Sequence, residues 1–180
     1  MAGNIILIGF MGVGKGRVAR ALVEKTGMFA IDTDDLIESL VNMTIRKIFT
    51  LHGELYFREL EQRTADWLRR NVRNTIVSTG GGFYKVRKIA KKDIVIYLHS
   101  SLENILAEMN AHPKAGKKIG KRPLLQDLKG ASALYEERLP LYRKVADLEI
   151  NVEQLEAEEV ADKIIRKLGL KTKKWESLSG

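Results

Sequence analysis

Residues 4–15 read NIILIGFMGVGK, and this stretch decides the fold class. Asn4–Ile8 is a short run rich in isoleucine, which is typical of a buried strand. Gly9–Lys15 then has the spacing G-x-x-x-x-G-K, in which the glycines let backbone N–H groups surround a phosphate and the lysine reaches the terminal phosphates. The stretch predicts a strand, a phosphate-binding loop and a helix in succession. The alternative is a glycine-rich turn that merely joins a strand to a helix.

Further short apolar runs, too short for helices, predict the other strands of a sheet. They are Phe29–Ile31, Thr75–Thr79, Asp93–Leu98 and Leu148–Val152. The segments between them carry apolar residues three and four positions apart, and the last such segment ends before Gly169, a plausible C-cap. Strands that alternate with helices predict an α/β fold with a parallel sheet covered on both faces.

Composition narrows the class of protein. A chain of 180 residues predicts a single domain, over residues 1–170 here, with 171–180 as a polar tail. The absence of cysteine excludes disulfides, a thiol nucleophile and thiolate metal sites. The longest apolar run, Ile94–Leu98, is far too short to span a bilayer, and the N-terminus lacks the features of a secretory signal. We therefore expect a cytoplasmic protein without a membrane partner.

The formal net charge of +8 favours an anionic partner. That partner is either a nucleic acid or a small anionic substrate. Because the basic residues form no long block, and no zinc-finger, basic-zipper or RNA-binding signature is present, we expect small anions and no nucleic acid.

Asp32-Thr33-Asp34-Asp35 follows the second expected strand. Carboxylates at the carboxyl end of a parallel strand point into the ligand crevice. On an extended chain Asp32 and Asp34 face the same way, so that one could hold hydrated magnesium while the other receives a substrate hydroxyl. We assign Asp35 to capping of the helix that follows.

Other candidate residues are ambiguous when taken singly. Gly80–Gly82 follows the third expected strand and predicts a close backbone approach, either to a ligand or for steric reasons in the loop. Glu61 lies three residues after Arg58 on a helix. It could orient the guanidinium of Arg58 or form a surface ion pair with it. The stretch from 111 to 121, AHPKAGKKIGK, is either an exposed basic loop or a lid over phosphates.

In their order along the chain, these motifs resemble those of the shikimate kinases. The resemblance runs from about Ile5 to Leu168 and includes GFMGVGK at 9–15, DTD at 32–34, Gly53 to Glu61, STGGG at 78–82, KRPLL at 121–125 and Arg138 to Tyr142. It implies a P-loop kinase of the nucleoside monophosphate kinase type, a three-layer sandwich whose five parallel strands have the order 2-3-1-4-5. It also implies transfer of the γ-phosphoryl of ATP to the 3-hydroxyl of shikimate, a step toward chorismate and the aromatic amino acids.

The resemblance further implies a role for each matching residue. Arg58 and Arg138 would hold the shikimate carboxylate with the backbone of Gly80, Gly81 and Gly82, while Asp34 would bind the ring hydroxyls. Phe57, Pro123 and Leu124 would pack on the ring. The nucleotide would be bound by Gly12, Val13, Gly14, Lys15, Gly16, Arg17 and Arg122, the last carried by a lid at about 111–122. Lys15, Asp34 and Arg122 would be catalytic, and Asp32 would support Mg²⁺ through water.

Two positions depart from the family pattern, and both lie on the nucleotide side. Gly16 stands where the motif has a serine or threonine whose hydroxyl binds magnesium. Glu108 stands where the family usually carries an arginine over the adenine. These departures motivate one alternative, a shikimate-binding relative with weakened catalysis. Two others are a kinase of another small hydroxylated acid or sugar and, on the net charge alone, a nucleic-acid-binding ATPase. We expect a monomer.

Overall fold

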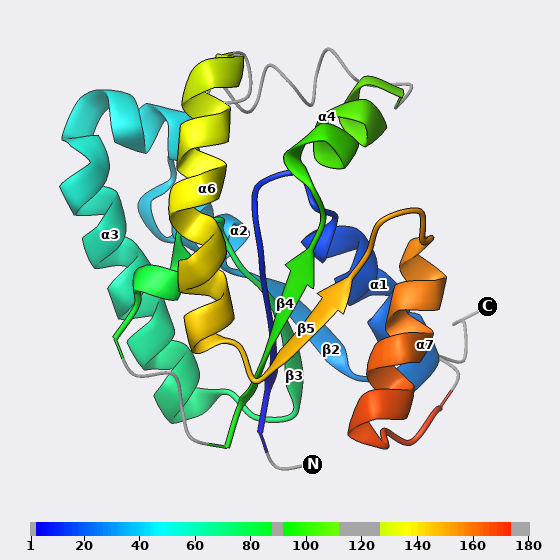
Figure 1. The fold of residues 1–180 in the computed structure, drawn as a ribbon. Helices are drawn as coiled ribbons and strands as arrows, with labels where there is room; N and C mark the ends of the chain where they lie inside the picture. Colours follow the sequence, from blue (N-terminus) through cyan, green and yellow to red (C-terminus); the bar gives the residue numbers. More distant parts are fainter. Residues whose placement is uncertain (1–2, 88–91, 112–126, 174–180) are drawn as a thin grey trace, which may run out of the picture.

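The computed structural model describes residues 3–87, 92–111 and 127–173. Its centre is a parallel five-stranded sheet in the order β2-β3-β1-β4-β5, which confirms the predicted strand order (Figure 1). The strands are β1 Ile5–Ile8, β2 Phe29–Asp32, β3 Thr75–Ser78, β4 Ile94–His99 and β5 Leu148–Asn151. Each begins and ends within one residue of its predicted bounds.

Helices cover both faces of this sheet, as the alternating pattern predicts (Figure 1). Helices α1 and α7 pack together on one face, and α3 and α6 lie on the other. Helix α7 ends at Gly169, whose φ of 59° confirms the predicted C-cap. The helical elements are α1 Lys15–Thr26, α2 Thr33–Val41, α3 Ile45–Asn71, the short 3-10 helix η1 Phe83–Lys85, α4 Leu102–Ala111, α6 Leu128–Val145 and α7 Ala157–Leu168.

The apolar side chains form two clusters. The larger surrounds the sheet and includes every residue of β1. A smaller cluster of Ile37, Ile48, Phe57 and Leu60 joins α2 to α3. Helix α3 is interrupted at Gly53, where φ is 77° and ψ is 177°. The interruption separates the first turns of α3 from the part that carries Arg58.

The carboxyl ends of the strands gather the predicted site at one edge of the sheet. The phosphate loop follows β1, Asp32 ends β2, and Gly80–Gly82 follows β3. Such an edge is where open parallel sheets bind ligands. Among residues 3–87, 92–111 and 127–173, no helix is both long and apolar enough to cross a membrane.

Candidate active site

The phosphate loop Gly9–Lys15 joins β1 to α1 in a conformation that depends on its glycines. Gly9, Gly12 and Gly14 all have a positive φ. At Gly12 a side chain would also lie within 2.8 Å of Met109 Sδ, because α4 packs directly on the loop. Lys15 is buried, and its Nζ donates hydrogen bonds to the carbonyl oxygens of Gly9 at 2.7 Å and Phe10 at 3.1 Å. The lysine therefore lies across the loop, next to the N-terminus of α1, where both would attract phosphate.

Asp32 caps helix α2, which corrects the assignment of that role to Asp35. Its Oδ1 accepts a hydrogen bond of 2.9 Å from the backbone N–H of Asp34, and Asp35 lies in the first turn instead. Helix α2 begins at Thr33, so the extended-chain argument for Asp32 and Asp34 is also wrong. The two carboxylates still lie near each other, because a helix N-terminus directly follows the strand.

The surroundings of Gly16 and Asp32 suit a hydrated cation. Asp32 Oδ2 accepts a hydrogen bond of 2.8 Å from the hydroxyl of Ser78. A side chain at Gly16 would begin 4.0 Å from that same hydroxyl oxygen and 3.7 Å from the guanidinium of Arg20. A carboxylate and a hydroxyl are oxygen ligands that can hold Mg²⁺ through its water shell. No group of three metal-ligating side chains occurs in the described parts of the chain.

Asp34 is the carboxyl group with the most altered acidity in the site. Its Oδ1 is enclosed and has no hydrogen-bond partner among the described residues. The point where a side chain at Gly80 would begin lies 2.6 Å from this oxygen, so Gly80 has to be a glycine here. Burial, together with the negative charges of Asp32 and Glu61, raises the pKa of Asp34 to about 7, against a lowering by Lys15. A carboxyl group that titrates near neutrality can exchange a proton with a substrate hydroxyl.

Arg58 is held by two glutamates. Its Nη1 donates to Glu61, while Nε and Nη2 donate to Glu54 Oε1 at 3.0 and 2.8 Å. Glu61 is 1% exposed, which excludes the surface ion pair considered above. Arg58 also lies against Gly82, where an added side chain would overlap the guanidinium. Glu61 and Glu54 thus orient the arginine toward the glycine turn.

Arg138 approaches the same glycine turn from α6. It is buried, and its Nη1 donates a 3.1 Å hydrogen bond to the carbonyl of Gly81, which also accepts from the hydroxyl of Tyr142. The Nε atom of Arg138 is buried and has no hydrogen-bond partner among the described residues. A buried cation of this kind suits an anionic ligand.

The two halves of the site meet at Gly81. A side chain there would begin 3.5 Å from the backbone nitrogen of Met11, in the phosphate loop, and 3.4 Å from Arg138 Nη1. One edge of the sheet therefore brings a polyphosphate cradle beside two arginines and a carboxyl group. This arrangement can place a small hydroxylated carboxylate next to a terminal phosphate.

Comparison with known proteins identifies the family. The sequence profile of the shikimate kinases matches residues 11–169. The chain belongs to the shikimate kinase family. A shikimate kinase of Helicobacter hepaticus is 38% identical over 162 residues, which cover 90% of this chain and 93% of that relative. The solved shikimate kinase of Acinetobacter baumannii in complex with shikimate has a TM-score of 0.77 at 32% identity and covers 92% of both chains.

The structure brings together most of the residues expected from the shikimate kinase pattern. Arg58, Arg138, Asp34 and Gly80–Gly82 converge on one place. Phe57 belongs to the smaller cluster, and the guanidinium carbon of Arg58 lies 5.3 Å from the centroid of its ring. Arg122, Pro123, Leu124, residues 112–122 of the expected lid and residues 174–180 of the tail lie outside the described residues.

Some residues of this shikimate kinase site were not assigned from the sequence. The spacing of four between Glu54 and Arg58 could have predicted their ion pair. Ser78, whose hydroxyl donates to Asp32, lies in the STGGG motif but was given no role from the sequence. Glu108, at the position where the family usually carries an arginine over the adenine, forms a 2.7 Å ion pair with Arg17. These two residues are far apart in the sequence, so no local pattern could pair them.

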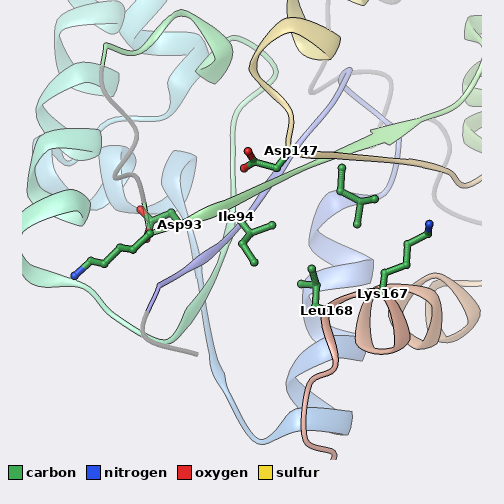
Figure 2. A pocket seen from close by; sticks show the side chains of 7 residues that line it. Asp93, Ile94, Asp147, Lys167 and Leu168 are labelled. Atoms are coloured by element: carbon green, nitrogen blue, oxygen red, sulfur yellow. The ribbon is translucent and has the colours of Figure 1, made fainter.

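A hollow at the opposite edge of the sheet has a structural explanation. Asp93, Asp147 and Lys167 line it near the amino end of β4 (Figure 2). Asp93 Oδ1 accepts hydrogen bonds from the backbone and side chain of Asn4 at 2.9 and 3.1 Å, and Asp147 accepts from the backbone of Val95 at 2.8 Å. Both carboxylates therefore fix the amino ends of strands, which leaves the carboxyl edge as the candidate active site of this shikimate kinase family member.

Proposed function

We propose that this chain transfers the γ-phosphoryl of ATP to the 3-hydroxyl of shikimate and forms shikimate 3-phosphate. The observation that carries the proposal is the convergence of Arg58 and Arg138 on the Gly81–Gly82 turn, beside Asp34 and the phosphate loop. Family membership and the relative solved with shikimate support this choice among small hydroxylated acids. The proposed protein is a cytoplasmic monomer, with residues 1–170 as its kinase domain.

On the acceptor side, Arg58 and Arg138 bind the carboxylate of shikimate. Their guanidinium groups match a carboxylate in charge and in hydrogen-bond geometry. Asp34 receives a ring hydroxyl, and its altered pKa allows it to accept the proton of that hydroxyl as transfer proceeds. Phe57, Pro123 and Leu124 pack on the ring.

On the donor side, ATP lies in the phosphate loop. The backbone of Gly12–Gly16 and the side chain of Lys15 bind its phosphates, and Arg17 and Arg122 add positive charge. Asp32 and Ser78 would hold Mg²⁺ through its water shell, and the ion would supply positive charge beside the phosphates. Because phosphoryl transfer depends on positioning and charge stabilisation, these residues supply what the reaction needs.

The test is ADP release with shikimate as acceptor. We expect shikimate to stimulate ADP formation, whereas an analogue that lacks the 3-hydroxyl binds without doing so. Asp34→Asn should lower the rate by at least about 100-fold, in the range typical of general acid–base catalysis. ADP release that is the same with and without shikimate would contradict the proposal.

A second candidate rests on Gly16, which removes the hydroxyl that usually ligates magnesium. A shikimate-binding protein with weakened catalysis would bind shikimate in calorimetry yet release almost no ADP. The two measurements together separate the candidates.

A further inference from the structure

Arg17 lies beside the phosphate loop, at Gly14. It stands in the first turn of α1, and its side chain folds back toward the loop. Its Nη2 and Nε atoms lie 3.3 and 3.5 Å from the point where a side chain on Gly14 would begin. A cation therefore lies beside the backbone that would surround a phosphate.

In the structure, the carboxylate of Glu108 forms an ion pair with this guanidinium. Glu108 lies on α4, and its Oε2 accepts a 2.7 Å hydrogen bond from Nη2 of Arg17 on α1. Its Oε1 accepts a 3.1 Å bond from the amide of Asn104, one turn earlier on α4. The carboxylate is thus held at both oxygens.

The packing of α4 against the loop fixes the position of Glu108. Met109 Sδ and Ile105 Cγ2 lie 2.8 and 2.9 Å from the point where a side chain on Gly12 would begin. Both residues are buried. The apolar contact between α4 and the loop therefore fixes a negative charge close to the place where phosphates would lie.

The ion pair itself is weak, because its two side chains are 46% and 37% exposed. Exposed pairs contribute about 0–1 kcal/mol. A polyphosphate carries several negative charges and offers the guanidinium two oxygens at once. Such an anion can replace the carboxylate as the partner of Arg17.

We propose that Glu108 is a built-in competitor of the nucleotide's phosphates for Arg17. In the free protein Glu108 holds Arg17, and the bound polyphosphate takes the arginine over, so that Glu108 keeps nucleotide affinity below what the loop and Arg17 alone would give. The inference rests on the proposed function, since it assumes that the loop binds ATP.

Glu108→Gln tests this inference directly. Glutamine has the same shape and can still accept from Asn104, but it has no charge with which to hold Arg17. We expect the variant to bind ATP and inorganic tripolyphosphate about 2- to 5-fold more tightly in calorimetry, as the loss of about 0.4–1 kcal/mol of competition implies. The gain should shrink as salt is added, because salt screens exposed charges.

Two further variants act as controls. Glu103→Gln removes the same charge from the exposed first turn of α4, away from the loop, and should leave both affinities unchanged. In an Arg17→Gln background, Glu108→Gln should have a clearly smaller effect, because the arginine for which it competes is gone.

Three results would overturn the inference: an unchanged or weaker affinity in Glu108→Gln, a gain of equal size without Arg17, or a gain with ATP that tripolyphosphate does not share. The last result would mean that position 108 acts on the base. Shikimate-dependent ADP release by the unaltered protein is measured in parallel. If that activity is present while Glu108→Gln binds like the parent, the inference fails and the proposed function stands. If neither ATP nor tripolyphosphate binds, both fail.

Discussion

Replacing Arg58 by alanine should damage both stability and substrate binding, and the structure allows the two effects to be separated. Glu61 is 1% exposed, and Arg58 is its ion-pair partner. Removing one member of a buried pair typically costs about 3–5 kcal/mol. Because Arg58 is itself 21% exposed and Glu61 can take up a proton, we expect a smaller cost, about 2–3 kcal/mol. For a domain of this size that lowers Tm by roughly 5–10 °C.

A second substitution separates the two roles. In Arg58→Ala/Glu61→Gln the buried carboxylate is gone, so most of the lost Tm should return. The charge-assisted hydrogen bond to shikimate does not return, and kcat/KM for shikimate should stay roughly 10- to 150-fold below the parent. Glu54→Gln is the matched control, since Glu54 is the exposed partner of Arg58 and its loss should change Tm by about 4 °C at most.

Calorimetric melting and steady-state ADP release measure the two effects. Recovery of both Tm and shikimate kinetics in the double variant would refute the binding role of Arg58. An unchanged Tm in Arg58→Ala would refute the dependence of buried Glu61 on its partner.

Three other predictions concern the remaining parts of the site. Gly16→Ser should lower the magnesium concentration needed for half-maximal rate several-fold, because its Cβ would lie 4.0 Å from Ser78 Oγ, without a clash, and its hydroxyl would add an oxygen ligand. An unchanged magnesium titration would contradict our metal assignment. Gly80→Ala should reduce kcat/KM for shikimate by about 100-fold with little change in ADP affinity, because its Cβ would lie 2.6 Å from Asp34 Oδ1. Equal losses for shikimate and for ADP would show that the loop as a whole had moved. Burial raises the pKa of Asp34 to about 7 from 3.8. The contribution of this group to the free energy of unfolding is therefore fully present below pH 4 and is lost as pH rises through 7. Asp34→Asn should therefore raise Tm at pH 8 in the absence of magnesium and change it little at pH 4, and melting curves that shift equally at both pH values would rule this out.

The sheet could be predicted from the sequence because its signals are local. A glycine-rich loop after an apolar run, and β-branched runs too short for helices, define the strands and their carboxyl ends. The spacing of Arg58 and Glu61 likewise predicted a contact that the structure contains. Glu61 could not be predicted to be buried, because burial depends on how α3 packs against the sheet.

Other features depend on contacts that no local pattern contains. Four polar residues in a row, 32–35, leave the end of β2 uncertain by a residue, and that single residue decides which aspartate caps α2. Arg17 and Glu108 meet because α4 crosses the phosphate loop, a consequence of how the strands are ordered. The pKa of Asp34 likewise arises from burial and from two carboxylates, Asp32 close to it in the chain and Glu61 on α3.

Because the smaller apolar cluster is separate from the core around the sheet, we expect the acceptor side of the site to unfold locally as a unit of its own. Ile37, Ile48, Phe57 and Leu60 hold α2 against α3 separately from the cluster around the sheet, and α3 is interrupted at Gly53, which has open space around it. Regions with few buried contacts open in native-state hydrogen exchange at a lower free energy than the core does. Amides of α2 and of the first turns of α3 should thus exchange through a partial opening that leaves β1 and β3 closed. A ligand that binds the closed form suppresses such an opening by RT ln(1 + [L]/Kd), so shikimate would act on this region as a local folding ligand.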